Sequence, residues 1–189
     1  MEILLEKNSL VLLAGPSGAG KSFWAKENFS EFVISSDEMR EMLVDDANDQ
    51  SINSEAFAAV HYLAEQRLLL GKSAIVDSTA LLPRDRKSLL DLAKKLDVSA
   101  TLIVIDADFE TCWKGQKSRR RQVPDDVIVK HQERLAQMRA AYKNGKLVRE
   151  GFNKVYWLKR EESEDTSIHW VYSLASEVDV IGDVHGCGS

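Results

Sequence analysis

The feature that most constrains this chain is a glycine-rich octapeptide, Gly15-Pro16-Ser17-Gly18-Ala19-Gly20-Lys21-Ser22. It follows the apolar run Leu10–Leu13, a candidate buried strand, and opens a helical stretch from Lys21 to about Asn28. The octapeptide matches the pattern G-x-x-x-x-G-K-S/T in full. Its glycines let the backbone curl around an oxyanion, and the positive end of the following helix adds to the attraction. The sequence therefore predicts a strand, a phosphate-binding loop and a helix, in that order.

Two side chains at the end of this loop predict how a nucleotide is held. Lys21 would reach the β- and γ-phosphates, and the Ser22 hydroxyl would coordinate Mg²⁺. Asp77 ends the strand candidate Ser73–Asp77, where an acid can hold the same ion; a helix-capping or turn role for Asp77 stays open. We expect ATP, or another NTP, and Mg²⁺ as cofactors. The nucleotide-binding residues expected in the loop are Gly15, Ser17, Gly18, Ala19, Gly20, Lys21 and Ser22.

Alternation of short apolar segments with helical periodicity predicts the fold class. Further strands are expected at 32–35, 100–106, 154–158, 168–174 and 178–181, and helices at 37–42, 53–70, 83–96, 109–117 and 125–142. Continuous apolar strands are typical of a parallel sheet covered on both faces. We therefore predict an α/β fold, namely a P-loop NTPase-type doubly wound parallel sheet with a helical lid.

Charge and cysteine content narrow the possible partners. The 189 residues carry a formal net charge of −5, so affinity for nucleic acid must come from local basic clusters. One such cluster comprises Lys114, Lys117, Arg119, Arg120 and Arg121. The two cysteines form no disulfide framework or zinc motif, which favours a reducing cytoplasm. No segment has the length needed to cross a bilayer, so we expect no membrane partner.

The acceptor side of the chemistry is indicated by Ser35-Ser36-Asp37-Glu38-Met39-Arg40. Asp37 follows a strand candidate, at the edge of the sheet where open α/β folds bind ligands. A carboxylate there can accept the proton of an attacking hydroxyl, and Arg40 lies one helical turn further on. The alternative is an N-cap aspartate with an ordinary i,i+3 ion pair to Arg40. The residues themselves leave both interpretations open.

Four segments together resemble the polynucleotide 5′-kinase family, most of all the kinase module of bacterial RNA-repair kinase–phosphatases. They are Gly15–Ser22, Ser35-Ser36-Asp37-x-x-Arg40, Val76-Asp77-Ser78-Thr79 with Pro83 and Arg86, and a basic lid ending Arg121-Gln122-Val123-Pro124. The resemblance covers nearly all of residues 8–150. It implies ATP-dependent phosphorylation of 5′-OH RNA or DNA ends in repair, and family members suggest a homodimer and an RNA-ligase partner.

The resemblance also implies roles for individual residues. Asp37 would be the general base, Arg40 would hold the phosphate next to the 5′ end, and Lys21 would stabilise the transferring phosphoryl group. Family members carry two lid arginines four residues apart, whereas the matching positions here fall near Lys114 and Ser118. We assign the catalytic lid role to Arg120 and a nucleotide contact to Arg121. Arg119 stays open as an alternative after a small register shift, as does Lys114, which would give up the bidentate grip on phosphate.

The end of the chain carries a second recognisable pattern. Asp179-Val180-Ile181-Gly182-Asp183-Val184-His185-Gly186 resembles the opening metal-binding motif of calcineurin-like phosphoesterases. We therefore expect a kinase domain at 1–175 and the truncated start of a metallophosphoesterase domain at 176–189, with a phosphatase domain downstream in the full-length chain. Asp183 and His185 alone do not make a two-metal site, so we expect no activity from them here.

Other interpretations stay open at this stage. A small-molecule or zeta-toxin-like P-loop kinase would share the loop and the acceptor aspartate, whereas a nucleotide-dependent switch would need neither Asp37 nor a lid. Arg84 and Arg86 either line a nucleic-acid path or face solvent. Trp113 either stacks on a base or packs in the core. His131, on an expected helix, is interpreted as a packed or surface histidine.

Overall fold

A five-stranded parallel sheet, in the order β3-β4-β2-β5-β6, forms the centre of the computed structural model, which describes residues 2–117, 123–160 and 166–171. The strands are β2 (Leu10–Ala14), β3 (Val33–Ser35), β4 (Ala74–Asp77), β5 (Ala100–Asp106) and β6 (Lys154–Lys159). The helices are α1 (Lys21–Asn28), α2 (Ser36–Val44), α3 (Asn53–Leu69), α4 (Pro83–Lys95), α5 (Phe109–Lys117), α6 (Asp125–Lys143) and α7 (Lys146–Glu150).

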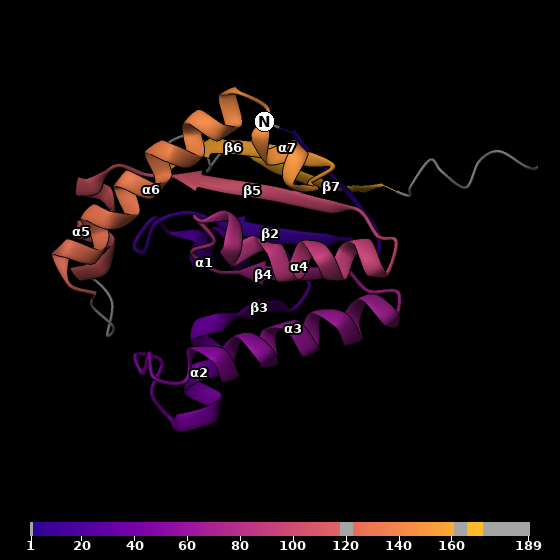
Figure 1. The fold of residues 1–189 in the computed structure, drawn as a ribbon, viewed down its shortest axis with the longest axis horizontal. Coiled ribbons are helices and arrows are strands. Elements are labelled where there is room, and N and C mark those ends of the chain that lie inside the picture. The colour runs from indigo at the N-terminus through magenta and orange to yellow at the C-terminus, as the bar shows by residue number, and fades with distance from the viewer. Residues whose placement is uncertain (1, 118–122, 161–165, 172–189) are drawn as a thin grey trace, which may run out of the picture.

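Both faces of the sheet are covered, as the continuous apolar strands predict. Alternate residues of β2 enter two separate cores, because successive side chains of a strand point to opposite faces. Leu10 and Leu12 pack with residues of α2, α3, α4, α6 and α7, whereas Val11 and Leu13 pack with residues of α1 and α5. Burial of each such leucine or valine side chain stabilises the folded state by about 1.5–3 kcal/mol relative to leaving it exposed. Figure 1 shows α5 and the start of α6 at the end toward which the β5 arrow points.

The N-terminal segment forms a strand that the sequence did not predict. β1 (Glu2–Glu6) pairs in parallel with β7 (Ser167–Val171) in a separate two-stranded sheet. Ile3 and Leu5 are fully buried while Glu2 and Leu4 face outward, so the strand has the period-2 pattern of a half-buried strand. Its backbone is tied to the main sheet, because the hydroxyl of Tyr156 donates to the Leu4 carbonyl at 3.2 Å.

Most elements lie close to their expected positions. The helix expected at 37–42 begins at Ser36 and ends at Val44, and the strand expected at 168–174 is β7, with 172–174 lying outside the described residues. The short helix α7 was not predicted, and the strand expected at 178–181 also lies outside the described residues. No helix in the described ranges is both long and apolar enough to span a membrane.

Arg86 takes neither of the two positions considered for it, because its side chain is buried. Its Nε and Nη2 atoms donate to the two carboxylate oxygens of Glu150 at 2.8 Å, and Nη1 donates to the Ala80 carbonyl at 2.7 Å. The arginine thereby joins α4 to the end of α7 and holds the turn after β4. Arg84, two residues earlier, has a side chain that is 79% exposed.

We expect Arg86→Met to lower the free energy of unfolding by about 3 kcal/mol, because the substitution leaves the Glu150 carboxylate without its buried partner. The matched control is Lys87→Met, which removes an exposed pair with Asp91 on the same helix and should cost at most about 0.5 kcal/mol. Urea denaturation of the three proteins measures both values. Equal losses in the two variants would contradict a structural role for the Arg86–Glu150 pair.

Candidate active site

The parallel register of three strands brings the expected site residues to one edge of the sheet. Leu13 of β2 pairs with Asp77 of β4, and Asp77 pairs with Ser35 of β3. The glycine-rich loop leaves β2 at this edge, and α2 begins at Ser36, directly after β3. Residues that are distant in sequence therefore emerge next to one another at the carboxyl ends of the strands, where ligands bind in such sheets.

The loop is held from two sides. The Gly15 amide donates to the Thr79 carbonyl at 3.0 Å, which ties the loop to the turn after β4. On the other side Gly18, at φ +84°, lies against α5: a Cβ atom added there would meet the Cys112 carbonyl oxygen at 2.1 Å. A Cβ added to Gly115 would meet the Gly18 carbonyl oxygen at 2.3 Å. Two glycines thus allow the loop and α5 to pack backbone against backbone.

Lys21, Ser22 and Asp77 lie together at the start of α1. The ammonium group of Lys21 donates to the Gly15 and Pro16 carbonyls, both at 3.0 Å, and so stays inside the loop. The Ser22 hydroxyl donates to Asp77 Oδ2 at 2.5 Å. Asp77 is buried, and this hydrogen bond directs its carboxylate toward the loop. A hydroxyl and a carboxylate oxygen side by side are ligands that Mg²⁺ accepts.

Asp37 lies in the first turn of α2 but does not cap the helix. Ser35 is the cap, because its hydroxyl accepts from the Glu38 amide. Asp37 Oδ1 instead accepts from Arg40 Nη1 at 2.6 Å, so the i,i+3 ion pair is present while the predicted alternative of an N-cap aspartate is wrong. The Asp37 side chain is 46% exposed. Its carboxylate is therefore both oriented and accessible to a ligand.

Arg40 is buried and held by more than its pair with Asp37. Its Nε and Nη2 atoms donate to Asn53 Oδ1 at 3.0 and 2.7 Å, and Nη1 also donates to the Ser36 carbonyl at 3.3 Å. Asn53 opens α3, so these contacts join the starts of two helices around one guanidinium group. The Asp37–Arg40 pair thus has a fixed orientation at the edge of the sheet.

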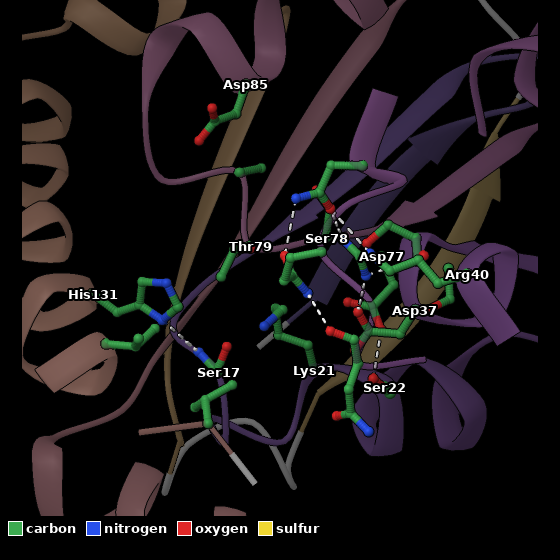
Figure 2. Close-up of a pocket in the computed structure, with 18 of the residues that line it drawn as sticks. Ser17, Lys21, Ser22, Asp37, Arg40, Asp77, Ser78, Thr79, Asp85 and His131 are labelled. Carbon is green, nitrogen blue, oxygen red and sulfur yellow. Dashed lines mark hydrogen bonds and ion pairs between the residues drawn. The ribbon is translucent and has the colours of Figure 1, made fainter. Parts of the chain in front are cut away.

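One cavity, of about 460 Å³, joins the loop to the Asp37–Arg40 pair. Figure 2 shows Lys21 between His131 on one side and Asp37 and Arg40 on the other. The residues that line the cavity include Ser17, Lys21, Ser22, Asp37, Arg40, Asn53, Asp77 and His131. The phosphate-binding loop and the carboxylate expected to act as base therefore face the same space, with room between them for a hydroxyl group.

His131 is a site residue that the sequence reasoning did not identify. His131 is buried, as the interpretation of a packed histidine holds, but it also lines the cavity, and its Nδ1 atom accepts a hydrogen bond from the Ser17 amide at 3.3 Å. Burial, with a smaller effect from the positive charges of Lys21 and Arg134, lowers the pKa of His131 to about 4. A polar residue at the buried position between Ile128 and Leu135 was the signal available in the sequence.

The lid is described only in part. Lys114 pairs with Glu110 at 2.7 Å and is well exposed, and the ammonium group of Lys117 lies 3.4 Å from the centre of the Trp113 ring. The ring also packs against the core, as one of the two interpretations of Trp113 held. The lid residues assigned to catalysis and nucleotide contact, Arg120 and Arg121, lie outside the described residues, as does Arg119.

The sheet order and the glycine-rich loop with an acid at the end of the neighbouring strand define a P-loop kinase fold. A family model described as an AAA domain, AAA_33, matches residues 10–144, and the chain belongs to that family. No curated protein matches the sequence.

Several solved structures share the fold. The Pnkp1/Rnl/Hen1 RNA repair complex matches with a TM-score of 0.62 at 19% identity, over 71% of this chain and 46% of that chain. A gluconokinase from Sinorhizobium meliloti 1021 matches with a TM-score of 0.55 at 15% identity, over 85% of this chain and 90% of that chain. The PezAT toxin-antitoxin system of Streptococcus pneumoniae matches with a TM-score of 0.52 at 18% identity, over 85% of this chain and 71% of that chain. This chain therefore spans less than half the length of the RNA-repair chain that it matches.

We expect Gly18→Ala to disrupt the loop, because the new methyl group collides with the Cys112 carbonyl as well as straining the backbone. Gly71→Ala is the matched control: Gly71 has φ +70° and nothing lies within 4 Å of an added Cβ, so only the strain remains. The control should cost about 1 kcal/mol of unfolding free energy and leave ATP affinity unchanged. Gly18→Ala should cost more and weaken ATP binding at least ~10-fold, or about 1.4 kcal/mol. Urea denaturation and calorimetric titration with ATP measure the difference, and equal effects would contradict the close packing of loop and α5.

Proposed function

We propose that this protein transfers the γ-phosphate of ATP to the 5′-OH end of RNA or DNA in nucleic-acid end repair, in the cytoplasm. The observation that carries the proposal is the common cavity, in which the half-exposed Asp37 carboxylate faces the Lys21–Ser22 end of the loop. In this proposal Asp37 accepts the proton of the attacking 5′-hydroxyl. The loop amides and Lys21 stabilise the charge on the transferring phosphoryl group.

Arg40 has two roles in the proposed reaction. It orients Asp37 through the 2.6 Å ion pair, and its guanidinium group would grip the phosphate next to the 5′ end of the acceptor. Arg120 and Arg121 of the lid would approach the γ-phosphate and the nucleotide from the other side, as the family resemblance implies. Most of the rate enhancement would then come from positioning and electrostatic stabilisation.

Magnesium fits the donor atoms at the start of α1. The Ser22 hydroxyl and the Asp77 carboxylate would hold the ion, with phosphate and water oxygens completing its shell. Within the described ranges no group of three or more His, Cys, Asp and Glu side chains gathers as a metal site. When bound, Mg²⁺ would neutralise charge on the β- and γ-phosphates.

A polymeric acceptor is supported by the extent of the cavity. Beyond Arg40 the lining continues to Asn48, Gln50 and Phe57, of which Phe57 is 40% exposed. An exposed aromatic ring is suited to stack on a base, and amide side chains can contact base edges. The likeness to the RNA repair complex supports the same class of acceptor.

The tail adds support from resemblance alone. The phosphoesterase-like pattern at 179–186 lies outside the described residues. We take it as the start of a phosphatase domain that would follow the kinase domain, so that one chain would act on both kinds of nucleic-acid end. A homodimer and an RNA-ligase partner belong to the same proposal.

A second candidate is phosphorylation of a small sugar-like acceptor. It is favoured by the match to the gluconokinase, which extends over 85% of this chain and 90% of that one. The same Asp37 and loop would serve, with Asn48 and Gln50 as hydrogen-bonding partners for acceptor hydroxyls. The two candidates therefore differ in acceptor and share the donor chemistry.

The acceptor can be identified by incubating the protein with γ-labelled ATP and Mg²⁺. We expect label on an oligonucleotide with a 5′-OH end and none on the same oligonucleotide carrying a 5′-phosphate. A parallel reaction contains gluconate as the acceptor in place of the oligonucleotide. Label on gluconate alone would favour the second candidate, and free phosphate without either labelled acceptor would overturn both.

Asp37→Asn tests the proposed base directly. Loss of the proton acceptor should slow transfer by about 10²–10⁴-fold, while ATP affinity stays within the error of the titration. The matched control is Glu38→Gln, one residue further along α2 on an exposed position, which should keep the wild-type rate. Initial rates with the 5′-OH oligonucleotide and calorimetric titration with ATP give both values. A wild-type transfer rate in Asp37→Asn would contradict the assignment of Asp37 as the general base.

A further inference from the structure

A histidine on α6 contacts the phosphate-binding loop from the side opposite Asp37. His131 Nδ1 accepts the hydrogen of the Ser17 amide at 3.3 Å, and both residues line the cavity. His131 is buried on the apolar stripe of α6, with Ile128 and Leu135 on the same face. It is the one α6 side chain for which the described residues show a hydrogen bond to the loop. Figure 2 shows this contact as a dashed line beside Lys21.

The protonation of the ring follows from its surroundings. Burial, together with the charges of Lys21 and Arg134, holds the pKa of His131 near 4, so the imidazole is neutral at pH 7. In a neutral imidazole one nitrogen carries the proton and the other is an acceptor. Because Nδ1 accepts from Ser17, the proton lies on Nε2.

Two residues that follow His131 on α6 fix the position of the helix. The amide of Gln132 donates to the Ala107 carbonyl at 3.0 Å, just after β5. Arg139 Nη2 donates to Asp106 at 2.8 Å, and Trp157 Nε1 donates to the same carboxylate at 2.7 Å. The backbone at position 131 is therefore anchored to the sheet, and the imidazole ring is the part that can adjust.

A bound phosphate would compete for the hydrogen that His131 now accepts. The amides of such a loop point at the phosphates of the nucleotide. Ser17 and Asp37 line the same cavity, and we take the Ser17 amide as one of those that would contact the terminal phosphate. Once a phosphate oxygen takes that hydrogen, the lone pair of Nδ1 would face an anion. A proton on Nδ1 would turn this repulsion into a charge-assisted hydrogen bond.

We propose that His131 is a positioning residue for the terminal phosphate of the donor: it gives up the Ser17 amide when the triphosphate binds, and its Nδ1 changes from hydrogen-bond acceptor to donor. Burial and the two nearby cations disfavour an imidazolium, so the expected route keeps the ring neutral. Nε2 loses one proton to water and Nδ1 gains one from water, with no net uptake. The inference rests on the donor half of the proposed function and is independent of the acceptor.

Nitrogen NMR of the histidine side chains reads the change without any turnover. In ¹⁵N-labelled protein without nucleotide, we expect the His131 ring to show an unprotonated Nδ1. A non-hydrolysable ATP analogue with Mg²⁺ should protonate Nδ1, whereas ADP with Mg²⁺ should leave it unprotonated. The signals are assigned with His131→Asn. Nδ1 remaining unprotonated with the triphosphate, or becoming protonated equally with ADP, would overturn the proposal.

The second measurement is binding affinity. The preference is expressed as the ratio of the dissociation constants of ADP and of the ATP analogue. His131→Phe keeps the bulk of the ring and removes its nitrogens, so we expect the preference to fall by about 10-fold, which corresponds to about 1.4 kcal/mol. His131→Asn offers an amide that can accept or donate, and should keep the preference within about twofold of wild type. His61→Asn, on α3 with a contact to the Ser88 carbonyl, is the control and should leave the preference unchanged.

The outcomes separate this inference from the proposed function. Failure of the wild-type protein to bind ATP would remove the donor half of the proposed function. Binding of ATP with an unchanged His131 signal and an unchanged preference in His131→Phe would remove only the role of His131. Should His131→Phe fail to fold, the NMR measurement on the wild-type protein still decides the matter.

Discussion

The in-register parallel pairing of β3, β4 and β2 is the constraint on which the site depends. It aligns the ends of three strands, so Leu13, Asp77 and Ser35 form one row at the carboxyl edge. The phosphate-binding loop, the carboxylate beside Ser22 and the start of α2 then emerge next to one another. A shift of one residue would move every side chain of a strand into the opposite core, so the specific packing of the two cores fixes the register and with it the site.

A second constraint is the contact between the loop and the helices α5 and α6. Gly18 and Gly115 allow backbone contact with α5, and His131 of α6 holds the Ser17 amide. Both contacts come from segments that follow β5 in sequence, about a hundred residues after the loop. The phosphates would therefore be surrounded by two parts of the chain whose mutual position is set by the core, since α6 is anchored at Asp106 and Ala107. Because α6 is anchored to the sheet, the His131 side chain rather than the helix backbone would adjust when a phosphate enters the loop.

The sequence predicted most of what local pattern controls. The loop, the helix after it and the acid at the end of β4 follow from spacing, and in the structure Asp77 accepts a hydrogen bond from the Ser22 hydroxyl. The sequence alone could not predict the contacts that tertiary packing determines. In the sequence Arg86 has the pattern of an exposed helix residue, because its partner Glu150 lies 64 positions later and comes close only in the folded structure. Asn53 and His131 are ordinary helix residues whose partners, Arg40 and Ser17, are determined by how helices pack. The strand β1 has no clear sign in the sequence, because its apolar residues Ile3, Leu4 and Leu5 are consecutive and its partner strand β7 lies far along the chain.

In the proposed phosphoryl transfer, the fixed orientation of the Asp37 carboxylate would help to align the attacking hydroxyl. The transition state of such reactions is loose, so the attacking oxygen needs alignment more than it needs early removal of its proton. Arg40 supplies that alignment: it is fixed by Asn53 and the Ser36 carbonyl, and it in turn fixes the carboxylate. A guanidinium group that is itself held on two sides turns a half-exposed side chain into a defined hydrogen-bond acceptor. In the proposed reaction this geometry would direct a hydroxyl toward the loop, and the part of the cavity beyond Arg40 would select the acceptor.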